Sequence, residues 1–242
     1  SGIPASSIWI SDPQPSAWLT KTGVNLNKSL PENPAVCLIA VKPQIIFEAI
    51  SNLNRYKQSK TLFISIAAGI KLKQLEQAIS SESTIIRAMP NTPSAIGKGI
   101  TALIGNSAAK NEHMMISKIL LEKISEVVEL EDEDQMDIVT GLSGSGPAYV
   151  FYLIESLTTA GIELGLSKEK ALQLAKATVA GSGALAMSSE EGPSVLRENV
   201  TSPNGTTQAG LEILMDKKYG LGPLIKSTVE AATKRSKDLG NG

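Results

Sequence analysis

The chain has 242 residues, a formal net charge of −1, 42% hydrophobic residues and 19% charged residues. This composition is ordinary for a globular protein of one large or two modest domains, and the balanced charge argues against nucleic acids or anionic membranes as partners. Three Phe, two Trp and four Tyr leave little material for stacking on nucleic-acid bases.

Short apolar runs alternate with helical patterns in the first part of the chain. This alternation predicts βαβ units and a parallel sheet, in which the strand at 34–41 is buried on both faces. The expected strands are 8–11, 34–41, 61–69, 84–90, 100–105 and 126–130, and the expected helices are 15–23, 43–56, 71–79 and 111–123.

The pattern changes near residue 131, after which every periodic segment indicates a helix. Two long helices are expected at 147–164 and 168–188, with Gly165 ending the first and Ser167 capping the second. Frequent Ala, Gly and Ser on the second helix suit close packing in a bundle or against a second subunit. We therefore expect an α/β domain over 1–131 and an all-helical domain over 132–242.

One cysteine and one histidine limit the chemistry available to the chain. Cys37 lies in the apolar run 34–41, where burial raises a thiol pKa, so a buried strand residue is favoured over a nucleophile. His113 falls on an expected helix, and no neighbouring motif supports a Ser-His-Asp triad. One Cys and one His cannot form the usual zinc ligand sets, so we expect no metal.

The first residues lack the basic and apolar regions of a secretory signal, and no apolar run approaches the length of a membrane span. We therefore expect a soluble, cytoplasmic protein without a membrane partner.

Small residues follow two successive expected strands, at the edge where an open α/β sheet binds its ligands. Ala40–Val41–Lys42 and Ala67–Ala68 would let a flat ring or a phosphate approach the backbone. Ordinary strand-to-helix turns explain each segment alone, but their repetition favours a cofactor cleft with Asn27 and Lys42 as polar candidates. A lysine in the first turn of a helix opposes the helix dipole, so an anionic neighbour would suit Lys42.

The glycine-rich segment GLSGSGPAY (141–149) precedes an expected helix start at Pro147. Glycine-rich turns often simply join helices. A packed crossing between domains is therefore at least as good an interpretation as a ligand contact.

The segment RENVTSPNGTTQAGLEIL (197–214) is a polar loop that runs into an apolar-periodic helix. If that helix begins near Thr206, the amides of Gly205, Thr206 and Thr207 have no intrahelical partners and lie at the positive end of the dipole. Ser202 and Thr207 add hydroxyls beside them. One capping residue satisfies a helix start, so the surplus of donors favours a carboxylate site.

Four segments, in matching order and spacing, resemble pyrroline-5-carboxylate reductases. The resemblance covers essentially the whole chain and implies a Rossmann-like domain, a helical dimerisation domain, and hydride transfer from NADPH or NADH to 1-pyrroline-5-carboxylate, which gives L-proline. It also implies a homodimer that can build larger rings, up to a decamer. The matching segments are LIAVKPQ, RAMPNTPSAIGKGITAL, LSGSGPAYVFYLIESL and RENVTSPNGTTQAGLEILMD.

The resemblance assigns roles to individual residues. Thr207 would hydrogen-bond the ring nitrogen of the substrate, and Thr206 and Thr207 with Ser202 and Gly205 would hold its carboxylate. Glu190, from the partner subunit, would line the substrate pocket. The implied cofactor contacts are Asn27, Ala40, Val41, Lys42, Ala67, Ala68, Asn199 on the nicotinamide side, and Glu133.

The chain departs from the family pattern at its beginning. The family opens with a strand and a G-x-G-x-x loop around the pyrophosphate, and this sequence has no such loop. Roughly 25–30 residues of the first βα unit are thus expected to be absent, which would weaken cofactor binding. Asp12 favours an NAD ribose, whereas the family favours NADPH.

Two alternatives stay open from the sequence. A reductase of the 6-phosphogluconate or β-hydroxyacid type would need a catalytic lysine; Lys168, Lys170 and Lys176 are available, but none lies in a matching motif. A truncated relative that serves as a dimerisation or binding module would bind no nicotinamide nucleotide.

Overall fold

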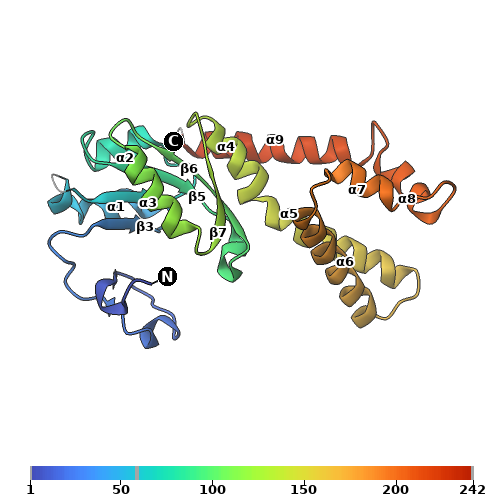
Figure 1. The fold of residues 1–242 in the computed structure, drawn as a ribbon, viewed down its shortest axis with the longest axis horizontal. Coiled ribbons are helices and arrows are strands. Elements are labelled where there is room, and N and C mark those ends of the chain that lie inside the picture. Colours follow the sequence, from blue (N-terminus) through green and yellow to red (C-terminus); the bar gives the residue numbers. More distant parts are fainter. Residues whose placement is uncertain (1, 58–59, 241–242) are drawn as a thin grey trace. The chain divides into compact units, whose positions relative to one another are not determined.

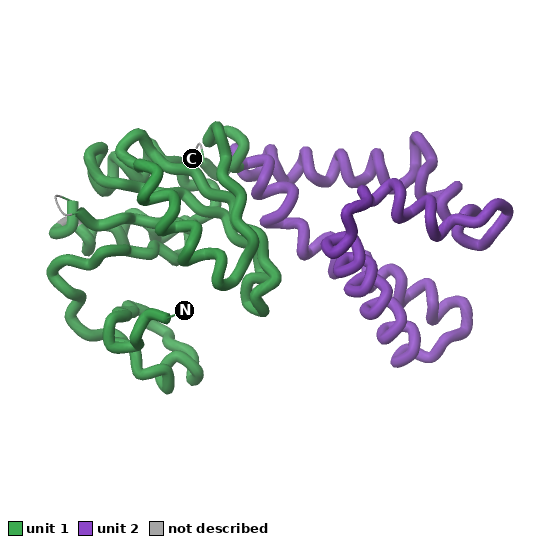
Figure 2. The backbone as a smooth tube through the Cα atoms, in the orientation of Figure 1, with its two compact units in different colours: residues 1–136, 238–242 green, residues 137–237 purple. Residues whose placement is uncertain are grey.

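A computed structural model describes residues 2–57 and 60–240. The chain divides into two compact units, residues 1–136 with 238–242 and residues 137–237 (Figure 2). The first unit thus extends to Met136, beyond the expected end at 131. The last residues also belong to it, because the end of the helix α9 (Leu221–Gly240) packs beside Gly69: a Cβ on Gly69 would lie 3.3 Å from the Cβ of Leu239.

The first unit is built on a sheet with the strand order β3-β4-β5-β6-β7 (Figure 1). β3, β4 and β5 are mutually parallel, as the sequence predicts. The strand expected at 8–11 forms as β1 but pairs with β2 in a separate two-stranded sheet. The bounds are β1 Trp9–Ile10, β2 Asn25–Leu26, β3 Val36–Ile39, β4 Leu62–Ser65, β5 Ile85–Met89, β6 Gly99–Gly105 and β7 Ser125–Glu129.

The expected parallel arrangement holds for β3, β4 and β5 and for the pair β6 and β7, but β6 runs antiparallel to β5. The link over residues 90–98 contains the 3₁₀ segment Thr92–Ile96, which ends at Gly97 with a left-handed φ of 70°. A parallel connection needs a crossover of about a dozen residues or more, and this link is too short for one. β7 follows the helix α3 (Asn111–Leu121) and lies parallel to β6.

The core of the first unit is formed by apolar side chains of the central strands. Ile64 of β4, Ile86 of β5 and Leu103 of β6 are at most 2% exposed and belong to one cluster. The expectation that 34–41 is buried on both faces is wrong, since Leu38 is 55% exposed. β3 is an edge strand of this sheet, with β4 as its neighbour among the described residues.

The helix expected over 43–56 is broken into shorter pieces. Pro43–Ile45 and Asn54–Tyr56 are 3₁₀ turns on either side of α1, Ile46–Ser51. The hydroxyl of Ser51 donates to the carbonyl of Glu48 (2.7 Å) at the end of α1. Such local side-chain bonds compete with the helical pattern, so polar residues here favour an early stop.

The second unit is helical, which confirms an α/β domain followed by a helical one (Figure 1). Across the described residues, each helix is too short or too polar to cross a membrane. The remaining helices are α2 Leu72–Ala78, α3 Asn111–Leu121, α4 Gln135–Val139, α5 Gly146–Glu163, α6 Lys168–Ser188, α7 Pro193–Asn199, α8 Thr206–Leu214 and α9 Leu221–Gly240.

α5 and α6 form a helical hairpin with the ends that the sequence predicts. Gly165 has a φ of 104° just after α5, and the Ser167 hydroxyl accepts from the amide of Lys170 (3.4 Å) at the start of α6. Gly161 and Ala171 meet where the helices cross: a Cβ on Gly161 would lie 3.2 Å from the Ala171 side chain. Small residues therefore allow the close approach of the two helices.

Candidate functional site

The hydroxyl-rich segment is a tight turn that leads into α8. The amide of Gly205 donates to the carbonyl of Ser202 (3.0 Å) across Pro203 and Asn204. Pro203 supplies the fixed φ of the first central position, and Asn204, with φ of 58°, takes the left-handed second position of a type II turn. A side chain at position 205 would collide with the Ser202 hydroxyl, so this close approach requires glycine.

α8 begins at Thr206, as the sequence predicts, and its first amides (Thr206, Thr207 and Gln208) have no intrahelical acceptors. The Gly205 amide is not free as expected, because the Ser202 carbonyl accepts it. Within the described residues, the hydroxyls of Ser202 and Thr207 make no hydrogen bond to protein groups. The turn therefore presents amide and hydroxyl donors at the positive end of a helix dipole, which suits a carboxylate.

Gln208 braces this turn, a role that the sequence reading missed. Its side-chain oxygen accepts from the amide of Asn204 (2.7 Å), and its Nε2 donates to Glu212 (3.2 Å). The geometry resembles one half of a capping box, in which the third helical residue accepts the N-cap amide, but here the accepted amide is that of Asn204, one residue earlier. The spacing from Gly205 to Gln208 was the signal that could have identified it.

Residues 197–199, expected as part of a loop, form the last turn of α7. The side-chain amide of Asn199 donates to Glu191 (3.0 Å), the residue next to Glu190. Glu190 is exposed just before α7. Among the described residues, neither side chain hydrogen-bonds the turn at 202–205.

An open groove of about 430 Å³ lies between α7 and α8. Its walls combine opposite charges with apolar side chains, and the predicted substrate residues are not among them. The lining residues are Arg197, Glu198, Thr201, Gln208, Leu211, Glu212 and Met215.

Five of the predicted cofactor residues of the first unit lie beyond the carboxyl ends of β3 and β4. Because these strands are parallel neighbours, Ala40–Val41–Lys42 and Ala67–Ala68 follow the same edge of the sheet. Lys42 is exposed, and no carboxylate lies within ion-pair distance of it among the described residues. An uncommitted cation beside small residues fits the phosphate and ribose groups of a dinucleotide.

Asn27 lies elsewhere, directly after β2 of the two-stranded sheet. Its side chain is committed to the backbone of Asp12: the oxygen accepts from the Asp12 amide (2.9 Å), and the nitrogen donates to the Asp12 carbonyl (2.8 Å). Its φ of 52° places it in the left-handed region, which Asn tolerates better than most residues. The observed role of Asn27 is thus to clamp the end of β1.

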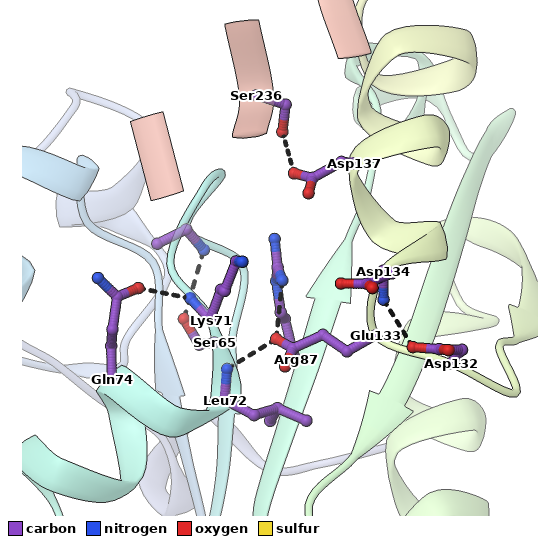
Figure 3. Close-up of polar contacts among 11 residues, drawn as sticks. Ser65, Lys71, Leu72, Gln74, Arg87, Asp132, Glu133, Asp134, Asp137 and Ser236 are labelled. Atoms are coloured by element: carbon purple, nitrogen blue, oxygen red, sulfur yellow. Dashed lines mark hydrogen bonds and ion pairs between the residues drawn. The ribbon is translucent and has the colours of Figure 1, made fainter. Parts of the chain in front are cut away.

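Glu133 is engaged with protein groups in the first unit (Figure 3). Its Oε1 accepts from the backbone amide of Leu72 (2.7 Å) and from Nη1 of Arg87 (2.8 Å). The Arg87 side chain is 3% exposed, so Glu133 supplies the counter-charge of a buried guanidinium.

The glycine-rich segment continues a helix instead of forming a turn. Residues Thr140–Gly144 are a π-helical segment between α4 and α5. Gly141 packs against α9 within the second unit, where a Cβ would lie 3.0 Å from the backbone of Thr233. Tyr149 donates to the Gly141 carbonyl (3.1 Å), a backbone group in the widened helix. The observed contacts of this segment are therefore packing contacts.

The surroundings of Cys37 and His113 indicate structural roles, not catalytic ones. Cys37 lies on β3 as expected but is half-buried, not fully buried. This partial burial raises the pKa of the Cys37 thiol to about 11, which disfavours the reactive thiolate. Nδ1 of His113 accepts from the amide of Lys110 (3.0 Å) at the start of α3. In the described part of the chain, no three His, Cys, Asp or Glu side chains are grouped to hold a metal ion.

Several pyrroline-5-carboxylate reductases are similar to this chain over nearly its whole length. The enzyme of Pseudomonas aeruginosa is 36% identical over 244 residues, which cover 98% of this chain and 89% of that protein. The structure of the Coxiella burnetii reductase has a TM-score of 0.91 at 32% identity and covers 98% of this chain and 90% of its own. A Plasmodium falciparum pyrroline carboxylate reductase with NADP bound has a TM-score of 0.85 at 32% identity, covering 99% and 89%.

The family model described as pyrroline-5-carboxylate reductase dimerisation matches residues 133–239, which include the whole helical unit, 137–237. The lysine-dependent alternative has no such support, and Lys168, Lys170 and Lys176 are all exposed on α6. The helix start at Thr206, the strand-end residues and these similarities agree: the chain belongs to the pyrroline-5-carboxylate reductase family.

Proposed function

We propose that this chain reduces 1-pyrroline-5-carboxylate to L-proline with NADPH or NADH, the last step of proline biosynthesis. The observation that carries this proposal is the donor-rich turn at the start of α8, found in a chain of this family. The chain is an NAD(P)H-dependent oxidoreductase that acts on a small molecule.

The substrate carboxylate binds at the N-terminus of α8. The amides of Thr206 and Thr207 donate to it, and the Ser202 hydroxyl adds a third donor from the preceding turn. Gly205 contributes by its lack of a side chain, which leaves room for that hydroxyl. The hydroxyl of Thr207 accepts the N–H of the protonated ring nitrogen, and Glu190 of a second subunit lines the remaining side of the pocket.

This set of groups is sufficient because hydride addition to an iminium needs no general acid. When bound, the reduced nicotinamide supplies the hydride that adds to the carbon of the C=N bond, and the bond electrons become the lone pair of a neutral secondary amine. The protein residues therefore anchor the carboxylate and hold the nitrogen in one orientation. Positioning and preorganised donors of this kind account for large parts of enzymatic rate enhancements.

The cofactor binds along the carboxyl ends of β3 and β4. Lys42 meets a phosphate or the adenosine ribose, and the small side chains of Ala40–Val41 and Ala67–Ala68 let the nucleotide approach the backbone. Asn27 and Asn199 are weaker candidates for cofactor contact, because their side chains are already hydrogen-bonded to Asp12 and Glu191. We propose that the protein prefers NADPH to NADH, because the exposed Lys42 suits the additional phosphate of NADPH.

The chain acts as a homo-oligomer, and the helical unit is the proposed dimer interface. In the single chain, large apolar side chains of this unit remain exposed, among them Phe151 (58%), Tyr152 (70%) and Ile213 (76%). Exposed apolar surface of this kind marks interaction sites. Assembly into a decamer and a cytoplasmic location stay predictions.

The reaction is tested by mixing the purified protein with 1-pyrroline-5-carboxylate and either NADPH or NADH. We expect loss of the reduced nucleotide matched by formation of L-proline. Replacing the exposed Lys176 of α6 by Met should leave turnover unchanged. Absence of proline with both nucleotides would contradict the proposal and favour a binding module.

A further inference from the structure

A single carboxylate oxygen joins three distant parts of the first unit (Figure 3). Oε1 of Glu133, which precedes α4, accepts from Leu72 at the start of α2 and from Arg87 on β5. Leu72 and Glu133 are 61 residues apart in the sequence. The contact is therefore purely tertiary.

The contact caps α2. The residue before this helix is Lys71, whose side chain can only donate hydrogen bonds and so cannot satisfy the amides of the first turn. The carboxylate of Glu133 accepts one of these amides and places a negative charge at the positive end of the helix dipole. Arg87 holds the same oxygen, so the buried guanidinium orients the cap.

The segment that this cap secures is the turn between β4 and α2, which carries Ala67 and Ala68. At its beginning, the hydroxyl of Ser65 accepts from the amide of Ala67 (3.4 Å). At its end, Gln74 accepts from the amide of Lys71 (2.9 Å). Glu133 fixes the next amide along the chain, so the turn is anchored on both sides of its small residues.

We propose that Glu133 is a positioning residue of the cofactor site: it holds the β4–α2 turn in the shape that receives the nucleotide, and Arg87 orients it. This inference rests on the proposed function, because it takes Ala67 and Ala68 as nucleotide contacts. It replaces a direct contact between Glu133 and the cofactor with an action through the backbone of Leu72.

The first readout needs no nucleotide. Hydrogen exchange of residues 66–75 should speed up in Glu133→Ala and much less in Glu133→Gln, because the Gln oxygen can still accept from the Leu72 amide. Unchanged exchange in Glu133→Ala would overturn the proposal. This readout keeps its meaning even if the protein does not reduce 1-pyrroline-5-carboxylate.

The second readout is the Kd for NADPH. We expect about a tenfold increase in Glu133→Ala, since charge-assisted hydrogen bonds are strong enough to change affinity by that factor. Glu133→Gln should stay within about threefold of the parent, since it keeps the acceptor at Leu72. Equal losses in both variants would overturn the proposal in favour of direct recognition of the carboxylate charge.

The double variant Arg87→Met/Glu133→Ala separates the cap from the unpaired buried charge. Removing both partners of a buried pair is far better tolerated than removing one. We expect the double variant to fold and still to bind NADPH about tenfold more weakly than the parent, because the Leu72 amide remains uncapped. Parental affinity in the folded double variant would overturn the proposal.

A matched control is Asp216→Asn in the second unit. This carboxylate also accepts backbone amides, from Lys218 (2.8 Å) and Tyr219 (2.6 Å). Its replacement should leave both the exchange of residues 66–75 and the Kd for NADPH unchanged. If it weakens NADPH binding as much as Glu133→Ala does, the effect is general loss of order and the proposal is overturned. If the parent protein binds no NADPH, the proposed function is overturned, and with it the expected changes in the Kd for NADPH.

Discussion

Ser236 near the end of α9 donates a hydrogen bond of 2.6 Å to the carboxylate of Asp137 in α4, 99 residues away in the sequence. Both residues are 4% exposed, and Figure 3 shows the bond between them. They also stand next to the two places where the chain passes between its compact units, after Met136 and after Lys237. This buried bond therefore ties the first and last helices of the second unit together.

We expect Ser236→Ala to lower the free energy of unfolding by about 1–3 kcal/mol, because it leaves a buried carboxylate without this donor. Urea unfolding measures the loss. Ser227→Ala is the matched control on the same helix, since the Ser227 hydroxyl is exposed and bonds its own helix at Pro223. If the two substitutions lower the free energy of unfolding equally, the bond to Asp137 contributes no more to stability than the exposed bond of Ser227.

Thr207→Ala should reduce kcat for 1-pyrroline-5-carboxylate by about 10²–10³, the usual loss when one positioned polar contact at a reacting centre is removed. Thr207→Ser should recover most of the rate, because it restores the hydroxyl. Steady-state kinetics of both variants tests this. A rate in Thr207→Ala close to that of the parent would exclude contact with the ring nitrogen.

Lys42→Met should raise the KM for NADPH about tenfold, as expected for loss of one charge-assisted contact, with little change in the KM for 1-pyrroline-5-carboxylate. The salt dependence of nucleotide binding should also weaken, because fewer charges are paired. Lys123→Met replaces another exposed lysine and serves as the control. If both variants behave alike, Lys42 does not contact the nucleotide.

The Cys37 thiol should react slowly in the folded protein. Burial raises its pKa from 9.0 to about 11, so the thiolate fraction near pH 8 falls by about a hundredfold relative to the unfolded chain. Iodoacetamide labelling with and without urea measures this ratio. Rapid labelling of the folded protein at pH 8 would contradict the burial of the thiol.

The same shift has a defined effect on stability. The folded protein holds the thiol proton more tightly than the unfolded chain, and this difference contributes to the free energy of unfolding. The contribution of Cys37 is fully present below pH 9 and is lost as the pH rises through 9 to about 11. The free energy of unfolding should thus fall over that interval in the parent. Cys37→Ala should show a smaller decline.

Local features of this chain could be read from its sequence. The apolar runs identify the strands β3 to β7, Gly165 and Ser167 mark the hairpin between α5 and α6, and the start of α8 falls at Thr206 as expected. The residue types at the strand ends and in the turn at 202–207 were sufficient to name the candidate site. These features depend on neighbours a few residues apart, whose propensities act locally.

The tertiary structure decided how these pieces combine. The short link at 90–98 turned β6 antiparallel to β5, and the edge position of β3 left Leu38 exposed. The family resemblance implies a cofactor contact for Glu133, yet its carboxylate accepts hydrogen bonds from Leu72 and Arg87. Contacts between residues tens of positions apart follow from packing and chain connectivity, which leave no periodic trace in the sequence.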